Sequence, residues 1–263
     1  MNALDELVAN AREDVARRRS HTAVEDLRSA GPPAGPPRAA HAFRDALAAP
    51  GLSIIAEHKR RSPSAGPIRP GSNVAEIARA YTAGGAAAIS VLTEERGFDG
   101  SLEDVRDAHA ACALPLLRKD FIVDPYQLDE ALAAGASAVL LIVAALERPD
   151  LIALHDQAGR LGLDVLIEVH DHAELETALA AGASIVGVNN RDLRDFSVDI
   201  GRTFELLDAI PADVVVVAES GISSREHLAR LREAGVGAAL IGERLMRAED
   251  PAAALAELLA PAL

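Results

Sequence analysis

Short aliphatic runs recur along the chain from residue 52 onward. Each run ends in polar residues and is followed by an amphipathic stretch of helix length. The runs cover residues 53–56, 87–92, 114–117, 138–143, 165–169, 185–188, 214–218 and 238–241. Their polar ends lie about 26 residues apart on average, the length of one strand, one helix and two short loops. The pattern therefore predicts eight consecutive βα units.

Glycines before alternate runs support closure of these units into a barrel. Gly85, Gly135, Gly182 and Gly235 stand before the second, fourth, sixth and eighth runs. Each lies where a helix is expected to end in a left-handed residue before a strand begins. An open doubly wound sheet is the alternative, but no Gly-x-Gly-x-x-Gly turn follows the first run. We therefore expect an α/β fold, a single (β/α)8 TIM barrel.

The first fifty residues have a different pattern. Residues 2–19 predict a charged amphipathic helix, and a second short helix is expected over 22–29. The stretch 31–37 is rich in proline and glycine, which interrupts regular structure. We therefore assign 1–50 to an N-terminal helical extension with a Pro/Gly-rich linker, and 51–263 to the barrel.

The composition and net charge of the chain limit the classes of molecule that it is expected to bind. The chain has 263 residues, 49% of them hydrophobic and only 3% aromatic, so the core must be built from Ala, Val, Leu and Ile. The formal net charge of −14 repels phosphate backbones and anionic lipids, so we expect no nucleic-acid or membrane partner. An anionic substrate would then need a few local cations inside a cleft. We expect a monomer and leave open a weak association with other enzymes.

The single cysteine, Cys112, excludes an internal disulfide and fits a reducing compartment, so we expect a cytoplasmic protein. Cys112 falls in the helix before the third strand, where a small buried filler is expected. No His, Cys or Asp cluster has metal-ligand spacing, so we expect no metal and no cofactor. Glu94 and Glu95 are interpreted as a solvated acidic loop.

Charged residues stand at the ends of the first, third and fifth strands, where a barrel builds its active site. Glu57 and Lys59 share one face of a strand, and His58 points to the other side, where it packs against a helix. Lys119 follows an aliphatic run, so we expect its pKa to fall towards neutrality, which suits a proton donor. Glu168, between Ile and Val, is costly to bury without a partner or a task.

The later strand ends add polar and small residues. Asn189 and Arg191 follow the sixth strand and offer an amide and a cation. Ser220 and Gly221 follow the seventh strand, and Gly242 follows the eighth. Small residues let backbone amides approach an anion, and these two loops are the usual phosphate site of the fold. Ser223 and Ser224 are expected to cap the next helix.

Taken together, the strand ends closely resemble those of the indole-3-glycerol phosphate synthase family. The matching runs are Ile-Ala-Glu57-His-Lys59-Arg-Arg-Ser62-Pro-Ser64, Ile-Ser-Val-Leu-Thr-Glu94, Leu-Leu-Arg-Lys119-Asp-Phe121-Ile-Val-Asp124, Leu-Ile-Glu168-Val-His, Gly-Val-Asn189-Asn-Arg191-Asp-Leu193, Ala-Glu219-Ser220-Gly221-Ile and Leu-Ile-Gly242-Glu-Arg-Leu-Met. Seven runs in the family's order make the resemblance specific. It covers the barrel and the N-terminal extension, which in the family covers the mouth.

The resemblance implies ring closure of 1-(2-carboxyphenylamino)-1-deoxyribulose 5-phosphate, with loss of carbon dioxide and water, in tryptophan biosynthesis. It implies Lys119 as general acid, Glu168 as general base and Lys59 as anchor of the anionic substrate. The full implied catalytic set is Glu57, Lys59, Lys119, Glu168, Asn189 and Ser220. The implied substrate contacts are Ser62, Phe98, Phe121, Leu140, Arg191, Leu193 and Glu219, and the implied phosphate contacts are Lys59, Ser62, Ser220, Gly221, Gly242 and Glu243.

Departures and alternatives remain. Glu243 puts a carboxylate beside the implied phosphate site, so we expect its side chain to turn away. A Schiff-base aldolase using Lys119 or Lys59 is one alternative, because a desolvated lysine suits imine chemistry. Phosphoribosylanthranilate isomerase is a second alternative. It requires a thiol at the end of the first strand, and Glu57 at that position argues against it. A non-catalytic binding barrel would have no reason to keep these buried charges. The weak association left open above would be with other tryptophan-pathway enzymes.

Overall fold

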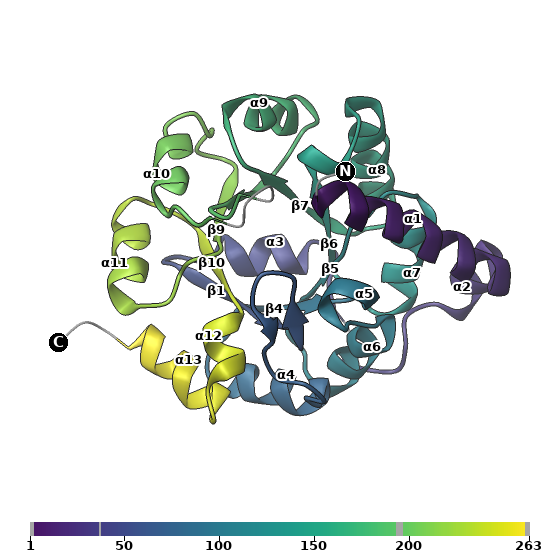
Figure 1. Ribbon diagram of the computed structural model, residues 1–263, viewed down its shortest axis with the longest axis horizontal. Coiled ribbons are helices and arrows are strands. Elements are labelled where there is room, and N and C mark those ends of the chain that lie inside the picture. The colour runs from purple at the N-terminus through teal and green to yellow at the C-terminus, as the bar shows by residue number, and fades with distance from the viewer. Residues whose placement is uncertain (1–2, 37, 193–196, 261–263) are drawn as a thin grey trace.

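Eight parallel strands close into a barrel in the computed structural model, which describes residues 3–36, 38–192 and 197–260. The strands are β1 (Ser53–His58), β4 (Ala88–Leu92), β5 (Leu116–Lys119), β6 (Ala138–Ile142), β7 (Asp164–Val169), β8 (Ile185–Asn189), β9 (Val215–Glu219) and β10 (Ala238–Ile241). Neighbours around the barrel are neighbours in sequence, and β1 closes the ring against β10. The predicted (β/α)8 barrel is confirmed (Figure 1).

Helices surround the barrel as its outer layer (Figure 1). They are α4 (Val74–Ala83), α6 (Leu102–Ala111), α7 (Tyr126–Ala133), α8 (Arg148–Arg160), α9 (His172–Ala180), α10 (Gly201–Leu207), α11 (Arg225–Glu233) and α13 (Pro251–Leu259). Short helices follow three strands: α5 (Glu95–Phe98), the 3-10 turn η1 (Val143–Ala145) and α12 (Glu243–Arg247). The loop after β1 folds into an antiparallel hairpin of β2 (Arg61–Ser62) and β3 (Gly66–Pro67). None of the described helices is long and apolar enough to cross a membrane.

Several strands run further than their aliphatic segments. β1 continues through Glu57 and His58, β5 starts two residues later than predicted and continues through Lys119, and β9 includes Glu219. Backbone pairing between parallel strands does not depend on side-chain polarity, so the ladder extends past the last aliphatic residue. As a result, these charged side chains stand on rigid strands rather than on loops.

The expected helix-ending glycines are left-handed. Gly85, Gly135, Gly182 and Gly235 have φ values of 92°, 86°, 88° and 83°, a region that residues with a Cβ seldom adopt. Cys112, which follows α6 directly, is buried as expected. His58 points out of the barrel, where its Nε2 lies 2.9 Å from Ser72 Oγ, and burial together with nearby Arg60 lowers its pKa to about 4.

Two apolar clusters hold the layers together. One lies between the strands and the surrounding helices and includes Ile54, Leu116, Leu141 and Val186. The other fills the barrel interior with the side chains of the opposite parity, such as Leu117. The strands are therefore aliphatic on both faces, as parallel strands buried on both sides require. The interior cluster stops short of the carboxyl ends, where the polar side chains begin.

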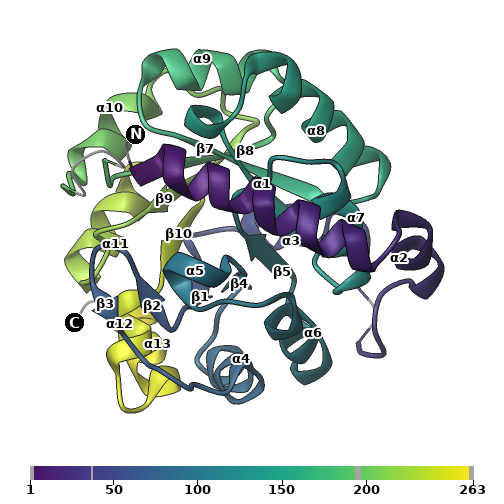
Figure 2. The same ribbon diagram turned by 45° about the vertical axis from the view of Figure 1, so that its right-hand side comes forward.

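The N-terminal segment packs onto the mouth formed by the carboxyl ends of the strands. α1 (Ala3–His21) runs across the front of the barrel, with α2 (Val24–Ala30) beyond it (Figure 2). Leu4, Leu7, Val8 and Ala11 of α1 pack against the interior cluster. Ion pairs fix the helix to α5 and α7 (Arg17 with Glu95 at 2.8 Å, Arg18 with Glu130 at 2.6 Å and Arg96 with Asp14 at 3.0 Å).

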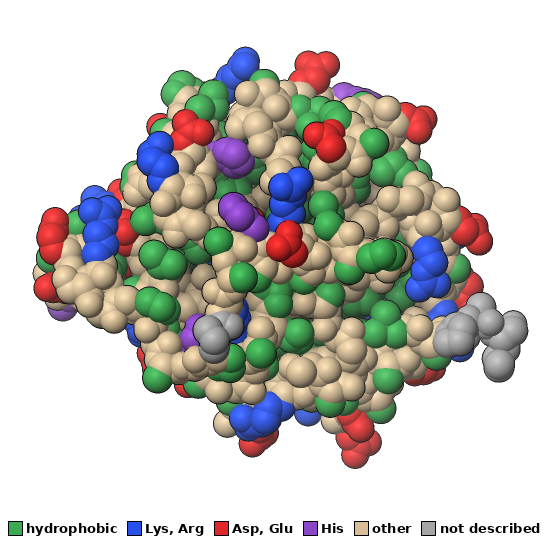
Figure 3. Space-filling model, turned by 180° about the vertical axis from the view of Figure 1, so that it is seen from behind, with side chains coloured by type: hydrophobic (Ala, Val, Ile, Leu, Met, Phe, Trp, Pro, Cys, Tyr) green, Lys and Arg blue, Asp and Glu red, His purple; other side chains and the backbone are tan. Residues whose placement is uncertain are grey.

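A further helix, α3 (Ala42–Leu47), was not predicted, and it closes the opposite end of the barrel. Its Phe43 and Leu47 are fully buried in the interior cluster. Asp164, the first residue of β7, accepts hydrogen bonds from the Arg44 amide and pairs with His41 Nδ1, each at 2.9 Å. The sequence pattern missed α3 because six residues are too few to display helical periodicity. On this face, seen in Figure 3, acidic and basic side chains are interspersed rather than gathered by sign.

Candidate active site

A cavity of about 440 Å³ opens at the carboxyl ends of the strands. Both lysines of the chain, Lys59 and Lys119, line it. The sequence-predicted residues that line the same cavity are Glu57, Lys59, Ser62, Phe98, Lys119, Phe121, Leu140, Glu168, Asn189, Arg191, Glu219, Ser220, Gly221, Gly242 and Glu243. Leu193, the remaining residue of that set, lies outside the described residues. The structure thus brings together side chains that are spread over almost 190 residues of sequence.

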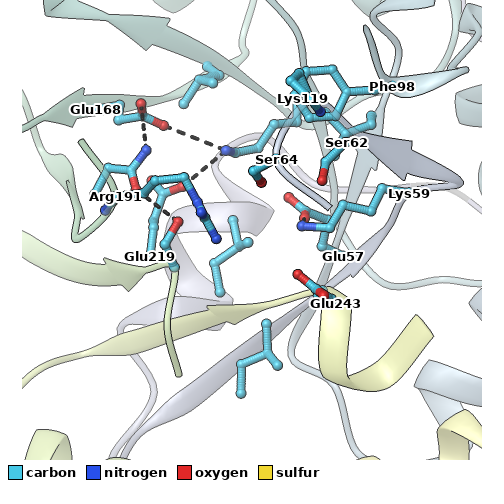
Figure 4. Close-up of a pocket in the computed structure, with 18 of the residues that line it drawn as sticks. Glu57, Lys59, Ser62, Ser64, Phe98, Lys119, Glu168, Arg191, Glu219 and Glu243 are labelled. Carbon is cyan, nitrogen blue, oxygen red and sulfur yellow. Dashed lines mark hydrogen bonds and ion pairs between the residues drawn. The ribbon is translucent and has the colours of Figure 1, made fainter. Parts of the chain in front are cut away.

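Lys119 stands at the centre of a carboxylate cluster (Figure 4). Its Nζ lies 3.1 Å from Oε2 of Glu219 and 3.5 Å from Oε2 of Glu168. Each of the two carboxylate side chains is no more than 3% exposed, so their charges are poorly solvated. The lysine reaches this point from β5, and the carboxylates come from β7 and β9 across the mouth.

The expectation that the pKa of Lys119 falls towards neutrality is wrong. Burial does lower it, but the negative charges of Glu219, Glu168 and Glu57 outweigh burial and raise the pKa above the usual lysine value. Lys119 is therefore held as an ammonium ion. The sequence pattern showed an aliphatic strand around Lys119, but not the three carboxylates that distant strands bring to it.

Glu219 is the most deeply confined member of the cluster. Its residue is 1% exposed, and burial together with the charge of Glu168 raises its pKa to about 7 in spite of Lys119. Neither carboxylate oxygen has a hydrogen-bond partner of good geometry among the described residues. The 3.1 Å contact with Lys119 is thus an attraction of charges rather than a well-aligned hydrogen bond. The cluster carries a proton near neutral pH more readily than an isolated carboxylate would.

A second lysine–carboxylate pair lies on β1 and its loop. Lys59 Nζ is 2.7 Å from Glu57 Oε1. Burial alone would raise the pKa of Glu57, but the ammonium groups of Lys59 and Lys119 hold it below its usual value. Gly242, at the end of β10, leaves room for this carboxylate, since a Cβ there would overlap Glu57 Oε1. The residue expected to admit a phosphate thus also has a packing reason to be glycine.

Hydrogen bonds orient the side chains around Glu168. The Asn189 side-chain amide donates to Glu168 Oε1 at 3.1 Å, and Asn189 Oδ1 accepts from Ser220 Oγ at 2.9 Å and from the Arg191 amide at 3.0 Å. This chain of contacts fixes the amide so that its NH₂ group faces the carboxylate. Asn189 therefore holds the Glu168 carboxylate in place with a hydrogen-bond donor.

The loops after β9 and β10 have small residues in unusual backbone conformations. Ser220 and Gly221 have φ values of 63° and 76°, and both line the cavity. Ser224 caps α11, as its hydroxyl accepts from the His227 amide, so the predicted cap is confirmed there. The Glu243 carboxylate accepts from Arg247 Nε at 2.9 Å, one turn along α12. An anion held by backbone amides in these loops would meet that ion pair rather than an isolated carboxylate.

Apolar side chains form the wall under α1. Phe121 and Leu140 belong to the interior cluster, and Phe98 packs against it. Glu94 helps to shape this wall, because its carboxylate accepts from the Arg96, Gly97 and Phe98 amides at the start of α5. The interpretation of Glu94 as part of a solvated loop is wrong, since its residue is 4% exposed. Burial raises the pKa of Glu94, and its hydrogen bonds from the three amides offset part of the cost of burial.

Sequence reasoning did not assign several residues that line the cavity, and three of them come from helices. Leu7 reaches the cavity from α1, and Arg244 and Arg247 reach it from α12. No periodic signal assigns Leu7 to the site, because the helical pattern marks it only as apolar. The arginines had a usable signal, since they follow the last strand end in an otherwise acidic chain. No group of three or more His, Cys, Asp or Glu side chains with metal-binding geometry occurs within the described ranges.

Solved structures resemble the barrel as a whole. Thiamine phosphate pyrophosphorylase from Pyrococcus furiosus aligns with a TM-score of 0.62 and 20% sequence identity, over 82% of this chain and 96% of that one. An N-acetylmannosamine-6-phosphate 2-epimerase from Clostridium perfringens gives 0.61 and 17%, over 80% and 93%. At such identities the likeness concerns the fold alone.

Sequence comparison is more specific. The chain is 51% identical over 257 residues to indole-3-glycerol phosphate synthase of Nocardioides sp., which covers 97% of each sequence. It is 49% identical to indole-3-glycerol phosphate synthase 2 of Streptomyces coelicolor, over 93% of this chain and 94% of that one. The family model for indole-3-glycerol phosphate synthase matches residues 4–258. With eight strands carrying this cluster at one mouth, the chain belongs to the indole-3-glycerol phosphate synthase family, a family of carboxy-lyases of tryptophan biosynthesis.

Proposed function

We propose that this protein closes the indole ring of indole-3-glycerol phosphate from 1-(2-carboxyphenylamino)-1-deoxyribulose 5-phosphate, releasing carbon dioxide and water. The observation that carries the proposal is the placement of Lys119, between two buried carboxylates at the mouth of a barrel of this family. The proposed substrate has a carboxylate, a phosphate and a flat ring. It therefore needs cations, small-residue loops and apolar walls in one cavity, and the described residues supply all three.

The first step joins an aryl carbon to the sugar ketone. In this step the ketone oxygen gains negative charge and needs a proton. Lys119 is held as an ammonium by its carboxylate neighbours, so it arrives charged and oriented for the developing alkoxide. An alkoxide is far more basic than an amine, so a raised lysine pKa does not prevent the transfer. We assign Lys119 as the general acid on this basis.

Loss of carbon dioxide then restores a neutral ring that still carries the new hydroxyl group. The hydroxyl group then takes a proton from Lys59, the second ammonium group of the cavity, and leaves as water, while a proton is taken from the neighbouring carbon and the indole double bond forms. We assign that proton to Glu168, because it lies beside Lys119 at the mouth and Asn189 holds its carboxylate in place. Acid and base thus stand side by side at one reacting centre, with 3.5 Å between Lys119 Nζ and Glu168 Oε2.

The remaining contacts position the substrate. Lys59 would anchor an anionic group, with Glu57 fixing its ammonium at 2.7 Å. The backbone at Ser220, Gly221 and Gly242 would bind the phosphate, with Arg247 as a nearby cation. The aryl ring would lie against Phe98 and other apolar residues under α1. Holding ring and ketone together on rigid strand ends is the main demand of the reaction.

Further contacts and the location of the enzyme belong to the same proposal. Ser62 would join the phosphate contacts from the hairpin after β1, and Arg191 and Glu219 would bind polar groups of the substrate. Phe121, Leu140 and Leu193 would complete the ring slot. A cytoplasmic location fits the free, buried Cys112.

The test is to supply the purified protein with the arylamino deoxyribulose phosphate and to follow indole fluorescence. Lys119→Met should fold normally and lower turnover by at least about 10²-fold, the lower range for acid–base groups. Near-normal turnover in this variant would remove Lys119 from the acid role. Absence of indole formation by the wild-type protein would remove the proposed reaction itself.

The Schiff-base alternative requires the opposite protonation state of Lys119. Imine formation requires a neutral amine, whereas the surrounding carboxylates hold Lys119 as an ammonium. Borohydride treatment in the presence of substrate tests this directly. Because Lys59 and Lys119 are the chain's only lysines, a trapped adduct would map to one of two positions. We expect no adduct at either of them.

A further inference from the structure

His170 lies next to Glu168 and is not among the residues that line the substrate cavity. It follows the last residue of β7, and its side chain is 13% exposed. Its Nδ1 is 3.0 Å from Glu174 Oε2, and its Nε2 is 3.6 Å from Glu168 Oε1. The imidazole therefore bridges the buried carboxylate at the mouth and a carboxylate on α9 near the surface.

Hydrogen bonding fixes which ring nitrogen carries a proton. Glu174 Oε2 also accepts from the His170 backbone amide at 2.8 Å, so this oxygen acts as an acceptor. Nδ1 must then be the donor of the contact with Glu174. A neutral imidazole with its proton on Nδ1 has a lone pair on Nε2. That lone pair would face Oε1 of Glu168, which is an acceptor as well.

Two hydrogen-bond acceptors that face each other at a buried position are stabilised when they share a proton. Nε2 of His170 is buried and has no hydrogen-bond partner among the described residues. The arrangement is satisfied when the proton lies on Nε2, which makes an imidazolium, or on Oε1, which makes Glu168 a neutral acid. A shift of a few tenths of an ångström from 3.6 Å would close the hydrogen bond in either case.

Once Glu168 has taken up a proton, the charges around His170 favour the first of these two states. The groups that act on it are Glu168 on its own strand, Glu174 on α9 and Arg202 on α10. Burial lowers the pKa of His170, and the two carboxylates outweigh burial and the cation Arg202 to raise it. The imidazole is thus a better proton acceptor than a free histidine.

We propose that His170 is a positioning and relay residue for Glu168: it takes the proton that Glu168 removes from the substrate and passes it towards solvent. The inference rests on the proposed function, which assigns that proton to Glu168. In the relay, the O–H bond at Glu168 breaks as an N–H bond forms at Nε2 of His170. Glu168 returns to its ionised form. The imidazolium then loses its Nδ1 proton to solvent by way of Glu174, and exchange with solvent moves the remaining proton from Nε2 back to Nδ1, so that Nε2 can accept again.

The burial of the three groups supports this direction. The Glu168 side chain is 3% exposed, that of His170 is 13% exposed and that of Glu174 is 21% exposed. Exposure thus rises stepwise from the reacting centre outward. A base that is enclosed under bound substrate needs such an outlet to be ready for the next turnover. Glu174, by holding Nδ1 and the His170 amide, would keep the ring aimed at Glu168.

The proton shared between His170 and Glu168 is measurable without turnover. The protonation state of His170 can be followed by imidazole ¹⁵N NMR, with His170→Asn used to assign its signals. We expect a raised His170 pKa in the wild-type protein and a lower one in Glu168→Gln and in Glu174→Gln. A His170 pKa that is the same in the wild type and in Glu168→Gln would overturn the inference.

Kinetics test the relay itself. In steady-state turnover, His170→Asn should lower kcat about tenfold or more, while KM changes less than twofold. Added imidazole should restore part of the rate, which it would not do for a packing defect. His172→Asn is the matched control, since His172 is an exposed histidine two residues away and should behave as wild type.

The outcomes separate the relay from the proposed function. Wild-type rates in His170→Asn, or a loss that imidazole does not restore and that falls on KM, would refute the relay while indole formation by the wild type still stood. If the wild-type protein formed no indole, the proposed function would fail, and the NMR titration would decide alone whether His170 and Glu168 share a proton.

Discussion

Replacing Glu219 by Gln tests the electrostatic account of the site through protein stability. In the folded chain, burial and Glu168 raise the pKa of Glu219 to about 7. In the unfolded chain the same carboxyl has its ordinary value. Between these two values the folded protein binds more protons than the unfolded one, so its stability falls as pH rises. Gln cannot titrate, so Glu219→Gln should lack this part of the pH dependence.

The size of the effect follows from the shift. One pKa unit corresponds to about 1.4 kcal/mol, and the raised carboxyl titrates within the window from about pH 5 to pH 8. Across that window the wild-type protein should lose about 2 to 3 kcal/mol more free energy of unfolding than Glu219→Gln. Most of the difference should appear below the folded pKa of about 7, where the folded carboxyl keeps a proton that the unfolded one has lost.

Urea unfolding followed by far-ultraviolet circular dichroism, at several pH values, measures this difference. Glu205→Gln is the matched control, because Glu205 is exposed on α10, and its curve should run parallel to that of the wild type. Parallel curves for the wild type and Glu219→Gln, within about 0.5 kcal/mol over the whole range, would refute the reasoning. They would mean that Glu219 titrates as an ordinary carboxyl in spite of its burial.

Two further substitutions test the packing of the barrel. Gly187→Ala should lower turnover at least about tenfold, because the added Cβ would overlap Glu219 Oε1 and displace it from Lys119. Gly159→Ala, which adds a Cβ with no atom within 4 Å, is its control and should leave turnover unchanged. Phe43→Ala should cost about 3 to 5 kcal/mol in the free energy of unfolding, since Phe43 is fully buried at the far end of the barrel. Its kcat/KM should stay near wild type, and a loss below about 1 kcal/mol would show that α3 does not help to close the barrel.

Much of the fold could be predicted from local pattern. Each aliphatic run is a strand buried on both faces, and each run is followed by a helix with its own apolar stripe. Gly135 and the corresponding glycines of the other helices mark helix ends, because the backbone there has a positive φ, which favours glycine. The helix α3 could not be predicted in this way, because six residues show no period and its role depends on the barrel end that it covers.

The position of the candidate site was also within reach of the sequence. Parallel strands point their carboxyl ends in one direction, so Glu57, Lys119, Glu168 and Asn189 had to meet at one mouth once the barrel was inferred. The resemblance to the indole-3-glycerol phosphate synthase family added the catalytic and binding roles of these residues, and those roles are proposals. The contribution of Leu7 to the cavity could not be predicted from the sequence, since only tertiary packing places α1 over that mouth.

The sequence by itself determined the barrel, the mouth and the side chains that gather there, because these follow from periodicity and strand direction. Tertiary structure alone decided the charge states. The pKa of Lys119 rises instead of falling, since carboxylates from β1, β7 and β9 surround it, and burial alone would have acted the other way. His170 likewise gains its bridging place only when α9 brings Glu174 to it. Electrostatic energies depend on distances of a few ångströms between groups far apart in sequence, and only the folded chain sets those distances.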